Sequence, residues 1–492
     1  DWQFLNGGDG FWVQPSPLNS SIVFAESQGG EMNRINLKSG LSYGIKPQRR
    51  LGEETHRWNW NTPIVTGPST KRYNSYNLYT GNQYLYKSTD EGTNWVRISP
   101  DLTTNDQEKQ KTEKSGGITG DNTSAENHCT IFTITQDPRN EDVVWVGTDD
   151  GNVQRTIDGG KTWTNLASRI WAAGIPKGAW ISCIELSASN KNQIFITAEN
   201  HMYGDHQTYL VQSLDGGNSF KRIQSKEFTG FAHVIRQDPV EPNLLFLGTE
   251  MGLFISLDAG VNWMRSKYQN IPWYALVRDL KISHTDDLAI ATHGRGIYVM
   301  DNLSTLRRFA KTPPSEAVVF FPIQPFRYEV SPQAPGSSEN LQGWTVSGKP
   351  ILPMMEYYLK EKSTQAVKIQ LFDAKGNKIK DLNAPGAKGM NRVYWGLDQN
   401  PPKVAVGGFI AQSSVLFASV IGPRAPIGTY KAVLQIGDLK KEQSLQLLEN
   451  PVDGFSSAKI QLLHTQAIRL FKLEEQLYYL CDTLDNQIAS LK

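Results

Sequence analysis

The sequence has little cysteine, no long apolar run and almost no net charge, and each shortage excludes a class of protein. Its 492 residues include three cysteines, Cys129, Cys183 and Cys481, and none belongs to a Cys-x-x-Cys pair. A disulfide-rich scaffold and a zinc ribbon are therefore excluded. No apolar run reaches about 18 residues, so we expect no transmembrane segment. A net charge of +1 lacks the basic excess of nucleic-acid-binding proteins, so we expect no nucleic-acid partner.

The chain does contain enough apolar material for a large core, together with an excess of tryptophan. Hydrophobic residues make up 39% and charged residues 20%, which is typical of folded globular domains. At about 150 residues per domain, the length suggests roughly three domains. Of the 13 tryptophans, 11 lie in the first 306 residues, so the two parts of the chain differ in composition.

A short motif occurs four times, at irregular spacing, in the tryptophan-rich part. It consists of Ser or Thr, any residue, Asp, any residue, Gly, two further residues, and Trp or Phe, and its aspartates are Asp90, Asp158, Asp215 and Asp258. Aspartate at the start of a hairpin turn accepts hydrogen bonds from the following backbone, and glycine allows a positive φ. The aromatic ring fills space between sheets. We therefore interpret these four aspartates as structural.

Short strands surround each motif. Val144–Gly151 aligns with Leu245–Gly252 and with Leu288–Gly296 as a strand, a polar turn and a second strand. When a strand is added before and after each such segment, the pattern predicts six units. They begin near Gly10, Asn59, Thr130, Trp180, Ala232 and Tyr274. Repeated four-stranded units of about 50 residues are typical of β-propellers. The predicted fold is therefore mainly β, with six visible blades and possible further strands upstream that close the ring.

These motifs are Asp-boxes, and the chain resembles the bacterial sortilin-like, BNR-repeat "glycosyl hydrolase" family. Arg57–Ile64, Ile98–Thr103 and Gly147–Gly151 match phrases of that family. The resemblance implies an Asp-box propeller over residues 1–309 and an immunoglobulin-like sandwich of the FlgD type after it. It also implies a bacterial protein that is secreted, periplasmic or associated with the outer membrane. Members of the family are usually longer, so we expect this chain to be part of a larger protein.

The repeats stop after about residue 309. Residues 310–319 contain Thr312-Pro-Pro-Ser315 and are predicted to be a linker. Residues 320–450 show period-two alternation, as in Val367–Phe372, which predicts the strands of the sandwich. The segment 331–349, rich in Ser, Gly and Pro, is predicted to be a long loop.

The last segment, residues 455–492, is predicted to be an amphipathic helix. Its leucines recur every seven residues, at Leu463, Leu470, Leu477, Leu484 and Leu491. Leu473 and Leu480 widen the same stripe. A face this apolar is not expected to remain in water. It is expected either to pair with a later helix of the same chain or to dock a protein partner or a second copy.

The turns expected around the centre of the propeller carry polar side chains. They are Glu26, Asp149, Asp150, Glu199, Asn200, His201, Glu250, His293 and Arg295. Two carboxylates that flank a glycosidic bond can hydrolyse it, and Asp149 or Asp150 with Glu250 is the candidate pair. The Phe-Arg-Ile-Pro signature of sialidases is absent, and no catalytic residue is carried over from the family. A glycoside hydrolase is therefore the alternative hypothesis.

A binding role is the favoured interpretation, because propellers present a wide face with variable loops. The candidate ligand contacts are Glu199, His201, His293, Arg295, Trp171 and Trp273. Aromatic rings suit sugar rings and peptide side chains alike, and the resemblance to sortilin-like propellers implies peptide binding in the channel. The charged stretch 105–114 is predicted to be a solvated loop. We therefore expect a non-catalytic recognition or assembly protein that binds polypeptide or glycan on the propeller face.

No cofactor or metal site is expected. The glycine-rich segment Gly116–Gly120 lacks the Lys-Ser/Thr ending of a phosphate-binding loop. His201, Asp205 and His206 lie in one loop, but the adjacent Asp205 and His206 make a poor set of metal ligands.

Overall fold

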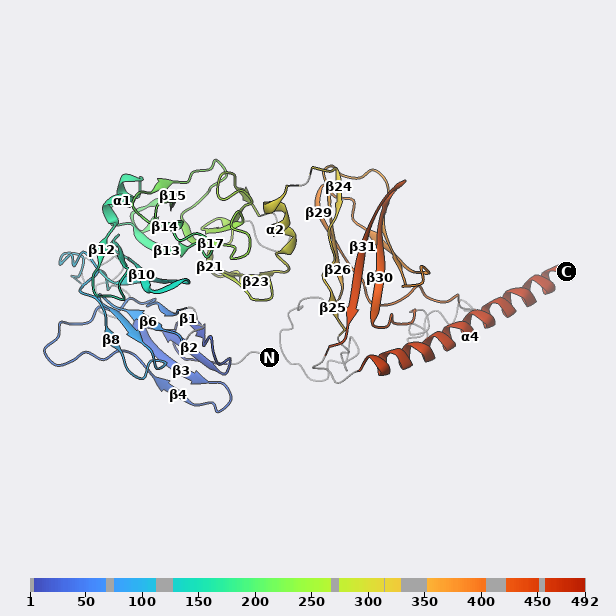
Figure 1. Ribbon diagram of the computed structural model, residues 1–492, viewed down its shortest axis with the longest axis horizontal. Helices are drawn as coiled ribbons and strands as arrows, with labels where there is room; N and C mark the ends of the chain where they lie inside the picture. The colour runs from blue at the N-terminus through green and yellow to red at the C-terminus, as the bar shows by residue number, and fades with distance from the viewer. Residues whose placement is uncertain are drawn as a thin grey trace. The chain divides into compact units, whose positions relative to one another are not determined.

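The computed structural model describes residues 4–67, 75–111, 127–266, 274–313, 315–328, 352–403, 422–450 and 456–491. The chain divides into two units, Asp1–Thr312 and Pro313–Lys492 (Figure 1). The division falls within the segment predicted to be a linker, whose ends belong to helix α2 (Ser304–Lys311) and strand β24 (Val318–Phe320). Trp273 and the predicted loop 331–349 lie outside the described residues.

The described part of the first unit contains six antiparallel sheets in chain order. Sheet 1 is β1 (Gly10–Pro15), β2 (Ile22–Ser27), β3 (Glu31–Asn36) and β4 (Ser42–Gly44); sheet 2 is β5 (Ile64–Thr66), β6 (Leu78–Gly81), β7 (Leu85–Ser88) and β8 (Val96–Arg97); sheet 3 is β9 (Ile131–Asp137), β10 (Asn140–Thr148), β11 (Val153–Thr156) and β12 (Thr164–Asn165). Sheet 4 is β13 (Trp180–Leu186), β14 (Ile194–Asn200), β15 (Asp205–Ser213) and β16 (Lys221–Arg222); sheet 5 is β17 (Ala232–Gln237), β18 (Leu245–Thr249), β19 (Gly252–Ser256) and β20 (Met264–Arg265); sheet 6 is β21 (Val277–Ile282), β22 (Leu288–Thr292) and β23 (Ile297–Met300). Each strand pairs with the next along the chain, so the sheets are propeller-like meanders.

The apolar cores of this unit lie between consecutive sheets. Phe24 and Ile64 share a core between sheets 1 and 2, and sheets 2 and 3, 3 and 4, and 4 to 6 are joined in the same way. Among the described residues, no apolar cluster joins sheet 6 to sheet 1. The first strand of sheet 6 begins at Val277 rather than near Tyr274 as predicted. The Tyr274 ring is exposed, and the Arg265 guanidinium lies over it.

The four Asp-boxes form the turns between the third and fourth strands of sheets 2 to 5. Asp258 Oδ1 accepts hydrogen bonds from the Asn262 N–H at 2.8 Å and from the Ser256 hydroxyl at 2.9 Å. Its Oδ2 accepts from the Asn262 carboxamide at 2.7 Å. In the other boxes the same set of bonds, with Asn, Thr or Ser in the place of Asn262, is made by Asp90, Asp158 and Asp215.

In sheets 2 and 3 the tryptophan of the box donates a hydrogen bond to the preceding sheet. Trp95 Nε1 in sheet 2 donates to the Ile45 carbonyl at 2.6 Å, directly after the last strand of sheet 1. Trp163 Nε1 in sheet 3 donates to the Ile98 carbonyl at 3.0 Å, directly after the last strand of sheet 2. In these two boxes the motif therefore shapes its own turn and also joins its sheet to the preceding one, whereas Trp263 Nε1 in sheet 5 donates to the Gly260 carbonyl of its own box at 3.0 Å.

Asp258→Ala is expected to lower the free energy of unfolding by about 1–2 kcal/mol, because the turn loses the acceptor of three hydrogen bonds, one of them from the buried Ser256 hydroxyl. Asp258→Asn should cost less, since a carboxamide oxygen still accepts from the Asn262 N–H. Urea denaturation followed by tryptophan fluorescence measures both variants. An unchanged midpoint for Asp258→Ala would contradict a structural role for the box.

The described part of the second unit contains two sheets that share one apolar core. The first has the order β24, β26 (Met354–Leu359), β29 (Gly389–Tyr394); the second has the order β25 (Phe326–Arg327), β31 (Leu439–Leu448), β30 (Gly428–Ile436), β27 (Val367–Phe372), β28 (Lys378–Ala384). The pair β25 and β31 is parallel and its neighbours are antiparallel, so the second sheet is mixed. Trp395 and Tyr357 are fully buried in the shared core.

Helix α4 (Ser457–Ser490) confirms the predicted C-terminal helix. The Ser456 hydroxyl accepts a hydrogen bond from the Lys459 N–H and caps the first turn. Of its described side chains only Ile460 is buried, and it packs into the core of the second unit. None of the helices among the described residues is long and apolar enough to cross a membrane.

Candidate functional site

Loops and turns of the first unit meet at one end of its sheets, which we call the loop face. There, the segment that leads into the first strand of a sheet contacts the turn between the second and third strands. The same backbone bond recurs in three sheets, from Asp149 N–H to Thr130 O (3.1 Å), Glu250 N–H to Phe231 O (2.9 Å) and His293 N–H to Leu276 O (2.8 Å). The three segments that align in sequence therefore occupy equivalent places in their sheets.

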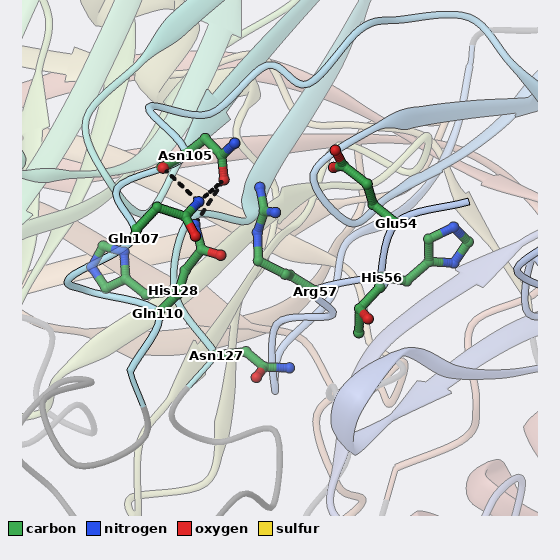
Figure 2. A pocket seen from close by; sticks show the side chains of 9 residues that line it. Glu54, His56, Arg57, Asn105, Gln107, Gln110, Asn127 and His128 are labelled. Atoms are coloured by element: carbon green, nitrogen blue, oxygen red, sulfur yellow. Dashed lines mark hydrogen bonds between the residues drawn. The ribbon is translucent and has the colours of Figure 1, made fainter. Parts of the chain in front are cut away.

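A cavity of about 360 Å³ opens on this face between sheets 2 and 3 (Figure 2). It is lined by Glu54, Thr55, His56, Arg57, Asn105, Gln107, Gln110, Asn127 and His128. Residues 54–57 lead into sheet 2, residues 105–110 follow its last strand, and residues 127–128 lead into sheet 3. Three segments that are far apart in sequence meet here because two adjacent sheets place their loops at the same end.

Arg57 is the cation at the centre of the lining residues (Figure 2). Its Nε donates to the Cys129 carbonyl at 3.1 Å, and its Nη2 donates to the Asp101 carboxylate at 2.7 Å and the Thr103 hydroxyl at 3.2 Å. Asp101 therefore balances the guanidinium charge. Nη1 has no hydrogen-bond partner among the described residues and remains available as a donor.

Burial disfavours the charged form of both histidines of the cavity. Burial lowers the pKa of His56. Burial also lowers the pKa of His128, and the nearby Lys109 lowers it further. His128 Nδ1 accepts a hydrogen bond from the Cys129 N–H at 2.8 Å, which places the ring proton on Nε2.

Four carboxamides, those of Asn105, Gln107, Gln110 and Asn127, complete the wall of the cavity. Gln107 Nε2 and Gln110 Nε2 both donate to Asn105 Oδ1, at 2.9 and 2.8 Å, as the dashed lines of Figure 2 show. Asn127 Nδ2 donates to the Trp58 carbonyl at 2.9 Å. Since every carboxamide carries both donors and an acceptor, this wall suits a polar ligand without net charge.

The carboxylates considered for hydrolysis, Asp149 and Asp150, are buried in the turn of sheet 3. Asp149 Oδ1 accepts from the Thr130 N–H at 2.8 Å, and its Oδ2 accepts from the Thr130 hydroxyl at 2.5 Å and the Asn59 carboxamide at 3.3 Å. Asp150 Oδ2 accepts from the N–H and the hydroxyl of Thr104, both at 2.7 Å. Burial, and then the neighbouring Asp150, raise the pKa of Asp149. In this arrangement the two carboxylates hold loops together.

Glu250, the third carboxylate of the hydrolysis hypothesis, belongs to sheet 5, and sheet 4 separates it from Asp149 and Asp150 along the series of sheets. Its Oε2 lies 2.9 Å from His206 Nδ1. General acid–base catalysis requires groups that reach the same substrate atoms. The structure brings Glu250 to His206 rather than to the two aspartates, and the catalytic assignment of all three stays a prediction.

Glu199, a candidate ligand contact, is buried and lies at the centre of three basic side chains. Its Oε2 lies 3.1 Å from His233 Nδ1, 3.7 Å from His201 Nδ1 and 3.9 Å from Arg278 Nη1. Burial raises the pKa of Glu199, but His233, Arg278 and His201 outweigh this effect and hold the pKa below its usual value. The His201 ring stacks on Phe231, with centroids 4.3 Å apart. The cluster therefore joins sheets 4, 5 and 6 with compensated charge.

The other candidate ligand contacts are dispersed over the loop face. Trp171 in helix α1 (Ala167–Ala172) is half-buried against the core of sheets 3 and 4, with Lys177 Nζ 5.2 Å from its ring centroid. His293 and Arg295 are exposed in the turn of sheet 6. A second cavity, of about 210 Å³, is lined by His206, Gln207, Thr208, Arg222, Gln224, Ser225, Phe228 and Gly230.

The carboxamide wall was missed by the sequence prediction, which treated residues 105–114 as a solvated loop. The available signal was three carboxamides within six residues, Asn105, Gln107 and Gln110, directly after the phrase Ile98–Thr103. Their proximity to Arg57 depends on the packing of sheet 2 against sheet 3, and no local pattern reports that packing.

No protein-family model matches the chain, and no curated protein sequence matches it. Among solved structures, "YCF48 bound to D1 peptide" is 10% identical with a TM-score of 0.33, over 60% of this chain and 93% of that chain. YCF48 from Cyanidioschyzon merolae is 13% identical with a TM-score of 0.32, over 60% and 96%. The β-propeller domain of Cps50 (Swd1) from Myceliophteria thermophila is 11% identical with a TM-score of 0.39, over 61% and 84%. Similarities at this level assign neither a ligand nor an activity to the chain.

Proposed function

We propose that the first unit recognises an uncharged polar stretch of polypeptide or glycan in the cavity between sheets 2 and 3, without catalysing a reaction on it. The lining of that cavity carries the proposal, because it combines four carboxamides, an arginine balanced by Asp101 and two histidines whose charged form is disfavoured by burial. Its one carboxylate, Glu54, accepts a hydrogen bond from the Tyr84 hydroxyl at 3.2 Å. Peptide groups and sugar hydroxyls can exchange hydrogen bonds with carboxamides in both directions. Arg57 Nη1 supplies a further donor.

We further propose that the six sheets are blades of an Asp-box propeller of the sortilin-like, BNR-repeat family. Four boxes with the same hydrogen bonds support this assignment. The two-sheet core of the second unit supports an immunoglobulin-like sandwich of the FlgD type. By the same resemblance, we place the protein in the bacterial cell envelope or outside the cell.

The test is to bind the full chain to arrays of peptides and glycans and then to titrate the best ligand by calorimetry. Replacing both Gln107 and Gln110 with alanine is expected to weaken binding by about tenfold or more, because each lost hydrogen bond to a neutral group contributes about 0.5–1.5 kcal/mol. Gln435→Ala is the control, because it also replaces a glutamine with alanine but on strand β30 of the second unit. It should bind the ligand with the same affinity as the unchanged protein.

Two results would count against this function. Equal affinity of the double variant, or no binding to either class of polymer, would remove the cavity as the recognition site. Release of reducing ends from a polysaccharide, lost in Asp150→Asn or Glu250→Gln, would support the hydrolase alternative instead.

A further inference from the structure

Helix α4 carries a seam of leucines that the described residues leave uncovered. With Leu463 at heptad position a, the a positions are Leu463, Leu470, Leu477, Leu484 and Leu491, and the d positions are Gln466, Leu473, Leu480 and Gln487. Leu470 is 63% exposed, Leu473 60% and Leu477 58%. Leucine therefore occupies every a position from 463 to 491 and the two central d positions, which is the pattern of the apolar seam of a coiled coil.

Apart from Ile460 at position e, which packs into the core of the second unit at the start of the helix, the contacts of α4 with its own unit come from the side away from the seam. His464 Nδ1 lies 2.8 Å from the Arg424 carbonyl oxygen, and Lys403 Nζ lies 5.2 Å from the centroid of the Tyr479 ring. His464 is at position b and Tyr479 at position c, and both positions face away from the a/d seam. The helix can therefore rest on its own unit and pair with another helix at the same time.

We propose that α4 pairs in parallel and in register with α4 of a second copy of this chain, as a two-stranded coiled coil. The charges beside the seam favour this partner. Arg469 and Glu474 are the only charged residues at the e and g positions from Ile460 to Ser490. In a parallel pair, a g residue faces the e residue five positions later on the other helix, so Arg469 meets Glu474 of the second copy on both sides of the seam.

An antiparallel pair leaves these charges without partners. There, g positions face g positions, and the g residues other than Arg469 are Leu462, Gln476, Thr483 and Ser490. Likewise e positions face e positions, and the e residues other than Glu474 are Ile460, Ala467, Cys481 and Ile488. In the parallel pair, Gln466 and Gln487 also meet their equivalents across the seam, where paired carboxamides select the register.

Analytical ultracentrifugation of the full chain at micromolar concentration is expected to give twice the chain mass of 55.1 kDa. Leu473→Asp together with Leu480→Asp should return the mass to that of one chain, because both leucines are exposed in a single copy and the seam alone is damaged. Gln461→Asp adds an acid at position f, opposite the seam, and should leave the mass doubled.

Charge exchange tests the orientation. Arg469→Glu or Glu474→Arg alone should weaken the dimer by about threefold to thirtyfold, because two exposed ion pairs are lost, and the two changes together should restore it. A single-chain mass, a mass of three or more chains, or a dimer unaffected by the leucine changes would overturn the proposal. A dimer that the combined charge exchange fails to restore would overturn the parallel arrangement.

Discussion

Asp149→Ala is expected to lower the free energy of unfolding of the first unit by about 3 kcal/mol, because it leaves several buried groups without an acceptor. These groups are the N–H and hydroxyl of Thr130 and the carboxamide of Asn59. Relief of the repulsion from Asp150 offsets part of the loss. The effect is large because Asp149 joins the loop that leads into sheet 2 to the loop that leads into sheet 3.

Tryptophan fluorescence during urea denaturation measures this effect well, since 11 of the 13 tryptophans belong to the first unit. Asp142→Ala is the matched control, because Asp142 lies on β10, the strand that leads into the turn of Asp149, is exposed and accepts no side-chain hydrogen bond in the described part of the chain. It is expected to change stability by less than about 0.5 kcal/mol. Equal midpoints for Asp149→Ala and Asp142→Ala would show that the Asp149 contacts do not stabilise the unit.

Glu26→Gln is expected to stabilise the first unit by about 2–4 kcal/mol at pH 8.5 and to change little near pH 4.5. Glu26 is 1% exposed, and its Oε1 accepts from the N–H groups of Gly30 and Thr62, both at 3.2 Å. Its buried Oε2 has no partner among the described residues. Burial raises the pKa of Glu26 from 4.5 to about 8, and glutamine resembles the protonated acid.

The direction of the pH dependence follows from that pKa. Between pH 4.5 and about 8 the folded chain keeps a proton on Glu26 that the unfolded chain has lost. The stability that this proton supplies is complete below pH 4.5 and is lost as the pH rises through about 8. The advantage of the glutamine variant should therefore grow across this range and level off above it.

Urea denaturation at pH 5 and pH 8.5 tests this dependence. Glu227→Gln provides the control, because Glu227 is exposed in the same unit and should show no difference at either pH. If the stability of Glu26→Gln relative to the parent chain is the same at both pH values, then Glu26 is already ionised in the folded protein.

The features that were predictable from the sequence are those whose chemistry is local. An Asp-box lies within eight residues, and its hydrogen bonds join Asp258 to Asn262 and Ser256 in the same turn. The aligned strand–turn–strand segments also form locally, so they identified the equivalent positions of Asp149, Glu250 and His293. The seven-residue leucine repeat predicted α4 because helical periodicity is a property of neighbouring turns.

The composition of the candidate site could not be predicted in this way. Asp149 and Glu199 have the same polar, turn-like sequence surroundings as solvated residues, yet both are buried and bonded to other segments. Gln107 and Gln110 occur in a stretch that is rich in charge, yet they line a cavity with Arg57. Burial and partner choice at these positions depend on which sheet packs against which.

By itself, the sequence determined that this protein has repeated Asp-box turns, propeller-like sheets and a long C-terminal helix with a leucine stripe. Only the tertiary structure decided which polar side chains are neutral, which are paired, and which meet in a cavity on the loop face. The physical reason is the distance along the sequence over which each kind of interaction acts. Turn chemistry and helical periodicity act over a few residues, whereas burial and electrostatic pairing depend on segments such as 54–57 and 105–110, which approach each other only after the sheets have packed.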